Sequence, residues 1–235
     1  MREILLEGLE RLGIPCTQER AETLCKYAQL LLERNRVMNL TAITDPLQVA
    51  RLHFLDSAAL FLAGPLAGKR LLDVGAGAGF PGMVVKLLEP RVSLTALDSL
   101  KKRMDFLEEA ARALGVEDAR FVHGRAEELG RLPGWREEFD AVTARAVADL
   151  RVLCELCLPF VRVGGVFLAM KGRDSEEELE AALPALETLG GSVERKLDYA
   201  LPGTDVTHRL LLIRKTAPTP DRYPRRFAKI QKSPL

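Results

Sequence analysis

The chain has 235 residues, 47% of them hydrophobic, and a formal net charge of +1 at pH 7. This length suits one sizeable domain, or one domain with a small extension. The near-zero charge excludes a protein that attracts nucleic acid through its overall field, so any such site must be a local patch. No run of 18 apolar residues occurs, and "MREILLEGLERLG" has the pattern of an amphipathic helix, not of a signal peptide. We therefore expect a cytoplasmic protein without a membrane span, and a monomer because no additional interface segment is recognisable.

Residues 1–64 are predicted to form an all-helical extension. Helices are expected over residues 2–12 and 17–35, with Thr17 as the N-cap of the second, and over about 46–62 after Pro46. The segment "NLTAITDP" breaks the helical pattern before the third helix.

After residue 64 the pattern changes to short apolar strands that alternate with helices. Strands are expected at 69–74, 92–98, 119–124, 139–145 and 164–172, with helices at about 80–89, 100–115, 146–158 and 175–188. Two more strands, on either side of a Pro202-Gly203 turn, form an antiparallel pair. The alternation predicts an α/β fold over residues 65–215, with a doubly wound, mostly parallel seven-stranded sheet and an antiparallel edge.

Residues 216–235 are predicted to form a basic tail that lies over this domain. Five cations fall within 11 residues with no acid among them: Arg222, Arg225, Arg226, Lys229 and Lys232. Two aromatic residues, Tyr223 and Phe227, are interleaved with them. Such a tail can clamp an RNA backbone. The alternative is a terminus that is merely soluble.

The stretch "LLDVGAGAGFPG" joins the first strand to the following helix and holds Gly75, Gly77 and Gly79. In doubly wound sheets a ligand binds beyond the carboxyl ends of the strands, and glycine lets the backbone approach that ligand. The spacing is G-x-G-x-G. A dinucleotide fingerprint would need glycine where Phe80 stands, and the Lys-Ser/Thr pair of a phosphate-binding P-loop is absent. A simple tight turn is the alternative, but one glycine would suffice for it.

Two acids accompany the glycine loop. Asp73 stands two residues before the first glycine, where it would oppose a pyrophosphate but would suit a ligand with an ammonium group. Asp98 ends the second strand, where a carboxylate can bind both ribose hydroxyls. Together they indicate a site for S-adenosylmethionine, whose cationic sulfonium and ammonium groups match this charge. After the third strand, Ala126 could lie against the adenine ring and the backbone near Glu127 could meet its edge, unless these residues are simply a solvated helix start.

The residues that could act on the methyl acceptor are few. The N-P-P-Y motif of exocyclic-amine methyltransferases is absent, and "TARAVADL" stands in its place. Cys154 and Cys157 lie within an apolar helical segment, so we interpret both as core residues, and three scattered histidines make a metal site improbable. A nucleophile that needs no deprotonation, such as guanine N7, fits this set best, because its attack depends on in-line positioning and not on a base.

Two cations end neighbouring strands and are expected to face the site. They are Arg145, after the fourth strand, and Lys171, after the fifth. Salt bridges to Asp73 or Asp98 are their alternative role. His53 could belong to the site or to the core.

Eight segments in chain order resemble the RsmG family, also called GidB, of bacterial 16S rRNA guanine-N7 methyltransferases. The match runs from about residue 35 to the end of the chain. The segments are "NLTAITDP", "HFLDS", "LLDVGAGAGFPG", "LDSLKKRMDFL", "GRAEEL", "FDAVTARA", "MKG" and "YPRRFAKIQKSPL".

The resemblance implies a Rossmann-like class I methyltransferase that methylates N7 of one guanosine in the 530 loop of 16S rRNA. S-adenosylmethionine would be the donor and S-adenosylhomocysteine the product, without a covalent enzyme intermediate. The rRNA would be met free, in a precursor or in the small ribosomal subunit. The donor-site residues that it implies are Gly75, Phe80, Asp98, Ser99, Leu100, Ala126, Glu127 and Arg145.

From their places at the mouth of the site, five residues are hypothesised to lie on the substrate side. They are Asn39, His53, Asp56, Arg145 and Lys171. Two other functions stay open. One is an NAD-dependent oxidoreductase, which Phe80 and Asp73 oppose, and the other is a non-catalytic RNA-binding factor in ribosome assembly.

Overall fold

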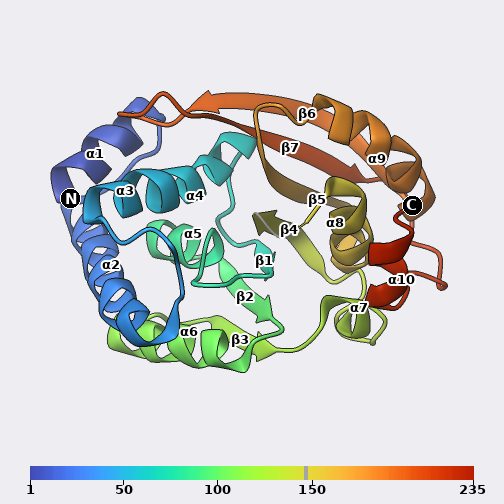
Figure 1. Cartoon of the computed structure of the whole chain (residues 1–235), viewed down its shortest axis with the longest axis horizontal. Coiled ribbons are helices and arrows are strands. Elements are labelled where there is room, and N and C mark those ends of the chain that lie inside the picture. Colours follow the sequence, from blue (N-terminus) through green and yellow to red (C-terminus); the bar gives the residue numbers. More distant parts are fainter. Residues whose placement is uncertain (146–147) are drawn as a thin grey trace.

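A computed structural model describes residues 1–145 and 148–235 of the chain (Figure 1). The helices are α1 (Arg2–Arg11), α2 (Gln18–Met38), α3 (Pro46–Gln48), α4 (Asp56–Ala58), α5 (Gly82–Leu88), α6 (Lys101–Ala113), α7 (Ala126–Leu129), α8 (Leu150–Cys157), α9 (Glu176–Leu189) and α10 (Phe227–Lys232). The strands are β1 (Arg70–Val74), β2 (Ser93–Asp98), β3 (Ala119–His123), β4 (Phe139–Arg145), β5 (Val161–Gly172), β6 (Gly191–Ala200) and β7 (Thr207–Lys215). Within the described ranges, no helix is both long and apolar enough to cross a membrane.

The seven strands form one sheet in the order β3-β2-β1-β4-β5-β7-β6. The first five strands in this order are parallel to one another, and β7 runs antiparallel to both β5 and β6. This confirms the predicted doubly wound sheet with an antiparallel edge. Because β1, β2, β4 and β5 are parallel, their carboxyl ends meet along one edge, as the pairing of Val74 with Leu97 and of Arg145 with Met170 shows.

Two hydrophobic clusters cover opposite faces of the sheet. Successive strand residues point to opposite faces, so Leu71 of β1 packs with α2, α5 and α6, while Leu72 packs with α8 and α9. Strands buried on both faces carry continuous apolar runs, which is the pattern that the sequence shows.

The N-terminal helices complete the first of these layers. They pack on α5 and α6, and they share one hydrophobic cluster with the sheet through buried residues such as Leu5, Tyr27 and Phe54. The single helix expected over 46–62 is instead a run of short pieces: α3, a π-helix η1 (Val49–Leu55), α4 and a 3₁₀-helix η2 (Ala59–Ala63). The changes of winding re-aim side chains along this segment, and π-helical turns are frequent at functional sites.

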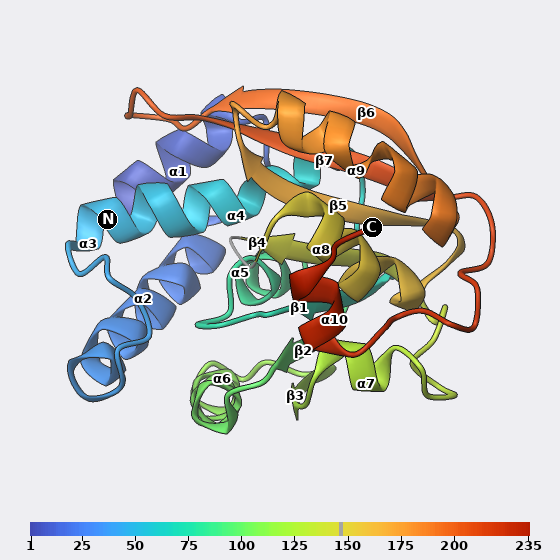
Figure 2. The ribbon, with the colours of Figure 1, turned by 45° about the vertical axis from the view of Figure 1, so that its right-hand side comes forward.

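The tail lies over the domain, as expected, but it has more structure than its sequence pattern indicates. It ends in α10, which packs on α8, and Figure 2 shows α10 in front of α8 and close to α7. Two side chains of the tail itself, Tyr223 and Ile230, are buried. The helix expected over 146–158 is described only as α8, because residues 146 and 147 lie outside the described part of the chain.

Candidate functional site

Two pockets open at the carboxyl ends of the parallel strands. The first, here called the β1–β2 pocket, has a volume of about 330 Å³ and lies between the glycine loop, the end of β2 and α7. The second, here called the β4–β5 pocket, has a volume of about 480 Å³ and lies between the ends of β4 and β5 and the N-terminal segment. Arg145 lines both pockets, so the two cavities adjoin at this side chain.

The glycine loop is fixed to the end of β2 by its own backbone. The N–H groups of Gly75 and Ala76 both donate to the carbonyl oxygen of Leu97, at 2.8 and 3.1 Å. Gly75 and Gly77 have φ angles of 72° and 57°, in the left-handed region that favours glycine. The loop therefore presents bare backbone at the floor of the β1–β2 pocket, which Gly75 lines.

The N-terminal extension supports the other side of the same loop. The hydroxyl of Tyr27, which is fully buried on α2, donates to the carbonyl oxygen of Ala78 at 2.5 Å. At Gly79, where φ is 85°, an added Cβ would collide with that hydroxyl. Gly79 is thus required for packing against α2. It does not line either pocket, and neither does Gly77.

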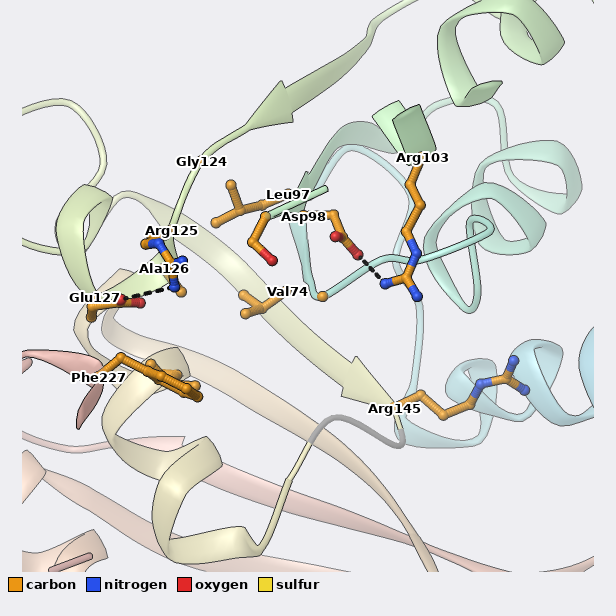
Figure 3. A pocket seen from close by; sticks show the side chains of 13 residues that line it. Val74, Leu97, Asp98, Arg103, Gly124, Arg125, Ala126, Glu127, Arg145 and Phe227 are labelled. Carbon is orange, nitrogen blue, oxygen red and sulfur yellow. Dashed lines mark hydrogen bonds and ion pairs between the residues drawn. The ribbon is translucent and has the colours of Figure 1, made fainter. Parts of the chain in front are cut away.

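Asp98 lies at the centre of the β1–β2 pocket, as Figure 3 shows. One of its oxygens accepts from the Gly77 N–H at 2.9 Å and from Arg103 at 3.1 Å, and the other accepts from the Leu100 N–H at 2.9 Å. A carboxylate offers about four lone-pair sites, so one remains for a ligand hydroxyl. Ser99 also lines the pocket, whereas Leu100 contributes only its backbone to Asp98.

Asp73 does not line the pocket where the ammonium contact was expected. Its side chain is fully buried beneath the loop, on the opposite face of β1 from Val74, and it accepts from the Gly82 N–H at the start of α5 at 2.8 Å. Its other oxygen has no hydrogen-bond partner among the residues that the structure describes. Burial raises the pKa of this carboxyl to about 7, against the lowering effect of the Gly82 bond and Arg145. Asp73 therefore organises the loop from below.

One end of the β1–β2 pocket is formed by α7, α8 and α10. Ala126, Leu156 and Phe227 line it with apolar side chains, and Arg125 and Glu127 line it with a charged pair. Figure 3 shows Phe227 beside Glu127 at this end and Arg145 at the far end, with Asp98 between them. The apolar side chains of α7, α8 and α10 thus lie at the opposite end of the pocket from Arg145.

Arg145 is the centre of a hydrogen-bonded cluster at the β4–β5 pocket. It donates to Asp56 at 2.8 Å, to the Leu52 carbonyl oxygen at 3.1 Å and to His53 Nδ1 at 3.1 Å. Its guanidinium carbon also lies 5.2 Å from the centre of the Phe80 ring. Its salt bridge is with Asp56, not with Asp73 or Asp98 as the alternative interpretation had it.

His53 is held in one tautomer by its neighbours. Arginine can only donate, so Nδ1 accepts, and Nε2–H donates to the Thr41 hydroxyl at 2.8 Å. The ring stacks on Phe80, with the centroids 4.6 Å apart and an angle of 17° between the planes. Burial and the Arg145 charge lower the pKa of His53 to about 4. His53 is thus neutral at neutral pH, with both nitrogens engaged. Phe80 lines neither pocket and instead supports Arg145 and His53.

Of the three remaining residues hypothesised on the substrate side, two line the β4–β5 pocket and one does not. Asp56, almost fully buried, lines the β4–β5 pocket and also accepts from Tyr199 at 2.8 Å, and it lies 2.7 Å from His208 Nδ1. Lys171 lines the same pocket and pairs with Glu178 at 2.5 Å. Asn39 lines neither pocket. It is the left-handed C-cap of α2, with φ of 50°, a conformation that asparagine tolerates.

Sequence reasoning missed four residues of this region. Thr41, Tyr199 and His208 join the Arg145 cluster from distant segments, and Phe227 joins the β1–β2 pocket from the tail. No local pattern marks them, because each is brought in by tertiary packing. In the described ranges 1–145 and 148–235, no group of three or more His, Cys, Asp or Glu side chains is placed to hold a metal ion.

Comparison with known proteins gives a family match. A family model described as rRNA small subunit methyltransferase G matches residues 20–198. A protein of Symbiobacterium thermophilum named Ribosomal RNA small subunit methyltransferase G is 50% identical over 240 residues, covering 100% of this chain and 98% of that protein. A protein of Alkaliphilus metalliredigens with the same name is 46% identical, covering 99% and 98%.

Solved structures show the same fold. A SAM dependent methyltransferase from Aquifex aeolicus superposes with a TM-score of 0.56 and 18% identity, over 74% of this chain and 96% of that one. TrmN from Thermus thermophilus gives a TM-score of 0.52 at 25% identity, over 68% of this chain and 48% of that one. The chain therefore has the Rossmann-like fold of class I methyltransferases.

Proposed function

This chain belongs to the rRNA small subunit methyltransferase G family, and we propose that it transfers a methyl group from S-adenosylmethionine to N7 of a guanosine in the 530 loop of 16S rRNA. The observation that carries the proposal is the pair of adjoining pockets that share Arg145. A transferase needs two sites that meet at one point, and here a site suited to the donor meets a second pocket, which carries charged side chains at the ends of β4 and β5.

The residues of the β1–β2 pocket fit S-adenosylmethionine. Asp98 retains a lone pair for a ribose hydroxyl, Gly75 offers bare backbone, and the end beside α7 is apolar enough for a purine ring. When bound, the donor supplies an electrophilic methyl group on its sulfonium. Asp73 would act through Gly82 and the loop, not by direct contact.

The β4–β5 pocket is assigned to the target guanine. Lys171 and Arg145 can donate to its carbonyl oxygen, and Asp56 can accept from its amino group, which is the chemistry a guanine edge requires. Asp56 also provides negative charge near a ring that gains positive charge when N7 is methylated. Positioning of the two reactants would supply most of the rate enhancement.

A general base is absent from this proposal for a structural reason. His53 accepts from Arg145 and donates to Thr41, so it has no nitrogen available to take a proton. Guanine N7 has a free lone pair at neutral pH and needs no deprotonation. The fixed histidine is therefore compatible with attack at N7.

Small-subunit rRNA is the partner that the names of the relatives imply. Arg125, which lines the β1–β2 pocket, is exposed, and so are four cations of the tail that contributes Phe227 to it: Arg222, Arg226, Lys229 and Lys232. They suit contact with phosphates. Arg225 is excluded from this set, because it is paired with the buried Glu155.

The test is methyl transfer from labelled S-adenosylmethionine into free 16S rRNA, precursor particles and 30S subunits, followed by mapping of the modified base. We expect one 7-methylguanosine in the 530 loop. A different base or position would refute the target, and no transfer into any form would support a non-catalytic assembly factor. Calorimetry with S-adenosylhomocysteine and with NAD distinguishes a methyltransferase from an NAD-dependent oxidoreductase. A protein that binds NAD but not S-adenosylhomocysteine would overturn the donor assignment.

A further inference from the structure

The tail contributes one aromatic ring to the β1–β2 pocket. Phe227, the first residue of α10, lines this pocket and is half-buried. Around it lie Ala126, at the start of α7, and Leu156 of α8. Figure 3 shows Ala126 and Phe227 at the end of the pocket opposite Arg145, beside the charged pair of Arg125 and Glu127.

The order of groups along the pocket indicates which part of a donor would meet this end. The glycine loop lies at the end of β1, and Asp98 follows at the end of β2. If Asp98 holds the ribose, the amino-acid part extends toward the loop and Arg145. The base must then extend the other way, toward Gly124, Ala126 and Phe227. A purine offers a flat face, and an aromatic side chain is a suitable surface for it.

The position of Phe227 is fixed by a buried ion pair two residues earlier. Glu155 of α8 has no exposed surface, and its carboxylate accepts from the backbone N–H of Arg225 at 2.7 Å. It also accepts from Arg225 Nε at 2.8 Å and from Nη2 at 2.6 Å. The ion pair therefore holds both the backbone and the side chain of Arg225 on α8.

Two arginines from the loop after α7 hold the preceding part of the tail. Arg131 donates to the carbonyl oxygens of Pro224 and Arg222, each at 2.8 Å. Arg136 donates to the carbonyl oxygens of Tyr223 at 2.9 Å and Thr219 at 2.5 Å. Ile230, with no exposed surface, anchors α10 beyond Phe227. The tail is therefore built into the domain on both sides of the ring.

We propose that Phe227 is a donor-binding residue, which forms the surface against which the adenine ring of the donor stacks, and that Glu155 and Arg225 position it. This inference rests on the proposed function, because it assumes a purine-containing donor in the β1–β2 pocket. It assigns to the tail a role in donor binding in addition to any contact with RNA.

The first experiment measures the Kd of S-adenosylhomocysteine by calorimetry for the wild type, Phe227→Ala, Phe227→Leu and Phe227→Tyr. Loss of an aromatic stack should raise the Kd about tenfold in Phe227→Ala, and less in Phe227→Leu, while Phe227→Tyr keeps the wild-type value. Gln231→Ala, an exposed residue of the same helix with no role in either pocket, is the matched control and should bind normally. Thermal melts of each variant check that the fold is intact.

A second ligand shows which part of the donor loses affinity when Phe227 is replaced. 5′-Methylthioadenosine contains the base and ribose but no amino-acid part, so Phe227→Ala should weaken it by the same factor as S-adenosylhomocysteine. Wild-type affinity in a folded Phe227→Ala variant would overturn the inference. A loss for S-adenosylhomocysteine but not for methylthioadenosine would also overturn it. If the wild type binds neither ligand, the proposed donor itself is wrong, which is a distinct result.

The positioning role is tested with Glu155→Gln, which keeps the size of the side chain but removes its charge. The variant should raise the Kd of both ligands, and Phe227→Ala in the same chain should then add less than it does alone, because both changes act on one ring. Full additivity would show that Glu155 does not act through Phe227.

Discussion

Arg145 at the end of β4 donates to Asp56 of α4 at 2.8 Å, across 89 residues of chain. This ion pair joins the α/β unit to the N-terminal extension at the wall between the two pockets. Tyr199 and His208, from β6 and β7, meet the same carboxylate. The extension is therefore a part of the site and not an appendage beside it.

Asp56→Asn should damage both stability and methyl transfer. The variant leaves the largely buried Arg145 guanidinium without its carboxylate, and removing one partner of a buried pair costs about 3 kcal/mol or more. We expect methyl transfer to fall at least about tenfold, since the guanidinium is no longer positioned. Denaturant unfolding and a single-turnover assay measure the two effects.

Glu109→Gln is the control for this variant. Glu109 of α6 also pairs with the N-terminal extension, at Arg34, but both side chains are substantially exposed. Loss of an exposed pair should cost less than about 1 kcal/mol and leave transfer unchanged. Equal effects of the two variants would contradict the role assigned to the Arg145–Asp56 pair.

Tyr27→Phe should weaken donor binding without a contact to the donor. It removes the hydroxyl that holds the Ala78 carbonyl oxygen, which becomes a buried acceptor without a partner at a cost of about 1–3 kcal/mol. The glycine loop then loses its support from α2, and the Kd of S-adenosylhomocysteine should rise several-fold. Thr216→Val removes a hydroxyl that donates to the Gly190 carbonyl oxygen at 3.2 Å, past the end of β7 and at the opposite edge of the sheet from the pockets, and should leave that Kd unchanged.

Asp98→Ala should raise the Kd of S-adenosylhomocysteine at least about tenfold, because it removes the proposed partner of the ribose and also the acceptor of the Gly77 and Leu100 N–H groups. Asp105→Ala, which removes an exposed partner of Lys101 on α6, serves for comparison. Calorimetry measures the Kd of S-adenosylhomocysteine for both variants. Unchanged affinity in the Asp98 variant would remove it from the donor site.

The buried carboxyl of Asp73 predicts an unusual pH dependence of stability. Its pKa is raised from 3.8 to about 7 by burial, so between these values the folded protein binds more protons than the unfolded chain. The stability that the protonated Asp73 adds to the folded protein is therefore fully present below about pH 4 and is lost as the pH rises through 7. From pH 5 to pH 8 the loss amounts to about 3 kcal/mol.

Asp73→Asn cannot titrate and provides the comparison. The free energy of unfolding, measured in urea at pH 5 and pH 8, should fall more for the wild type than for this variant over that interval. A wild type that gains stability relative to the variant as the pH rises would show that the carboxyl is ionised in the folded state.

The sequence alone determined the sheet, the glycine loop and several residues that line the β1–β2 pocket. Strand and helix periodicity is local, and the chain order of strands and helices allows few topologies, so the carboxyl ends of β1, β2 and β3 could be placed with Gly75, Asp98 and Ala126. The family match over residues 20–198 covers all of the ordered motifs except the closing one.

Only the tertiary structure decided how distant side chains combine. Arg145 could have paired with several acids, and packing of the extension selected Asp56. Asp73, whose sequence position suited an ammonium contact, is buried beneath the loop because β1 alternates its faces. The sequence assigned Phe227 and Arg225 to the same basic tail without distinguishing their roles. In the structure Phe227 lines a pocket, whereas Arg225 pairs with Glu155. Spacing along the chain fixes which face a residue occupies, but its partner is fixed by long-range packing, and no local pattern records that choice.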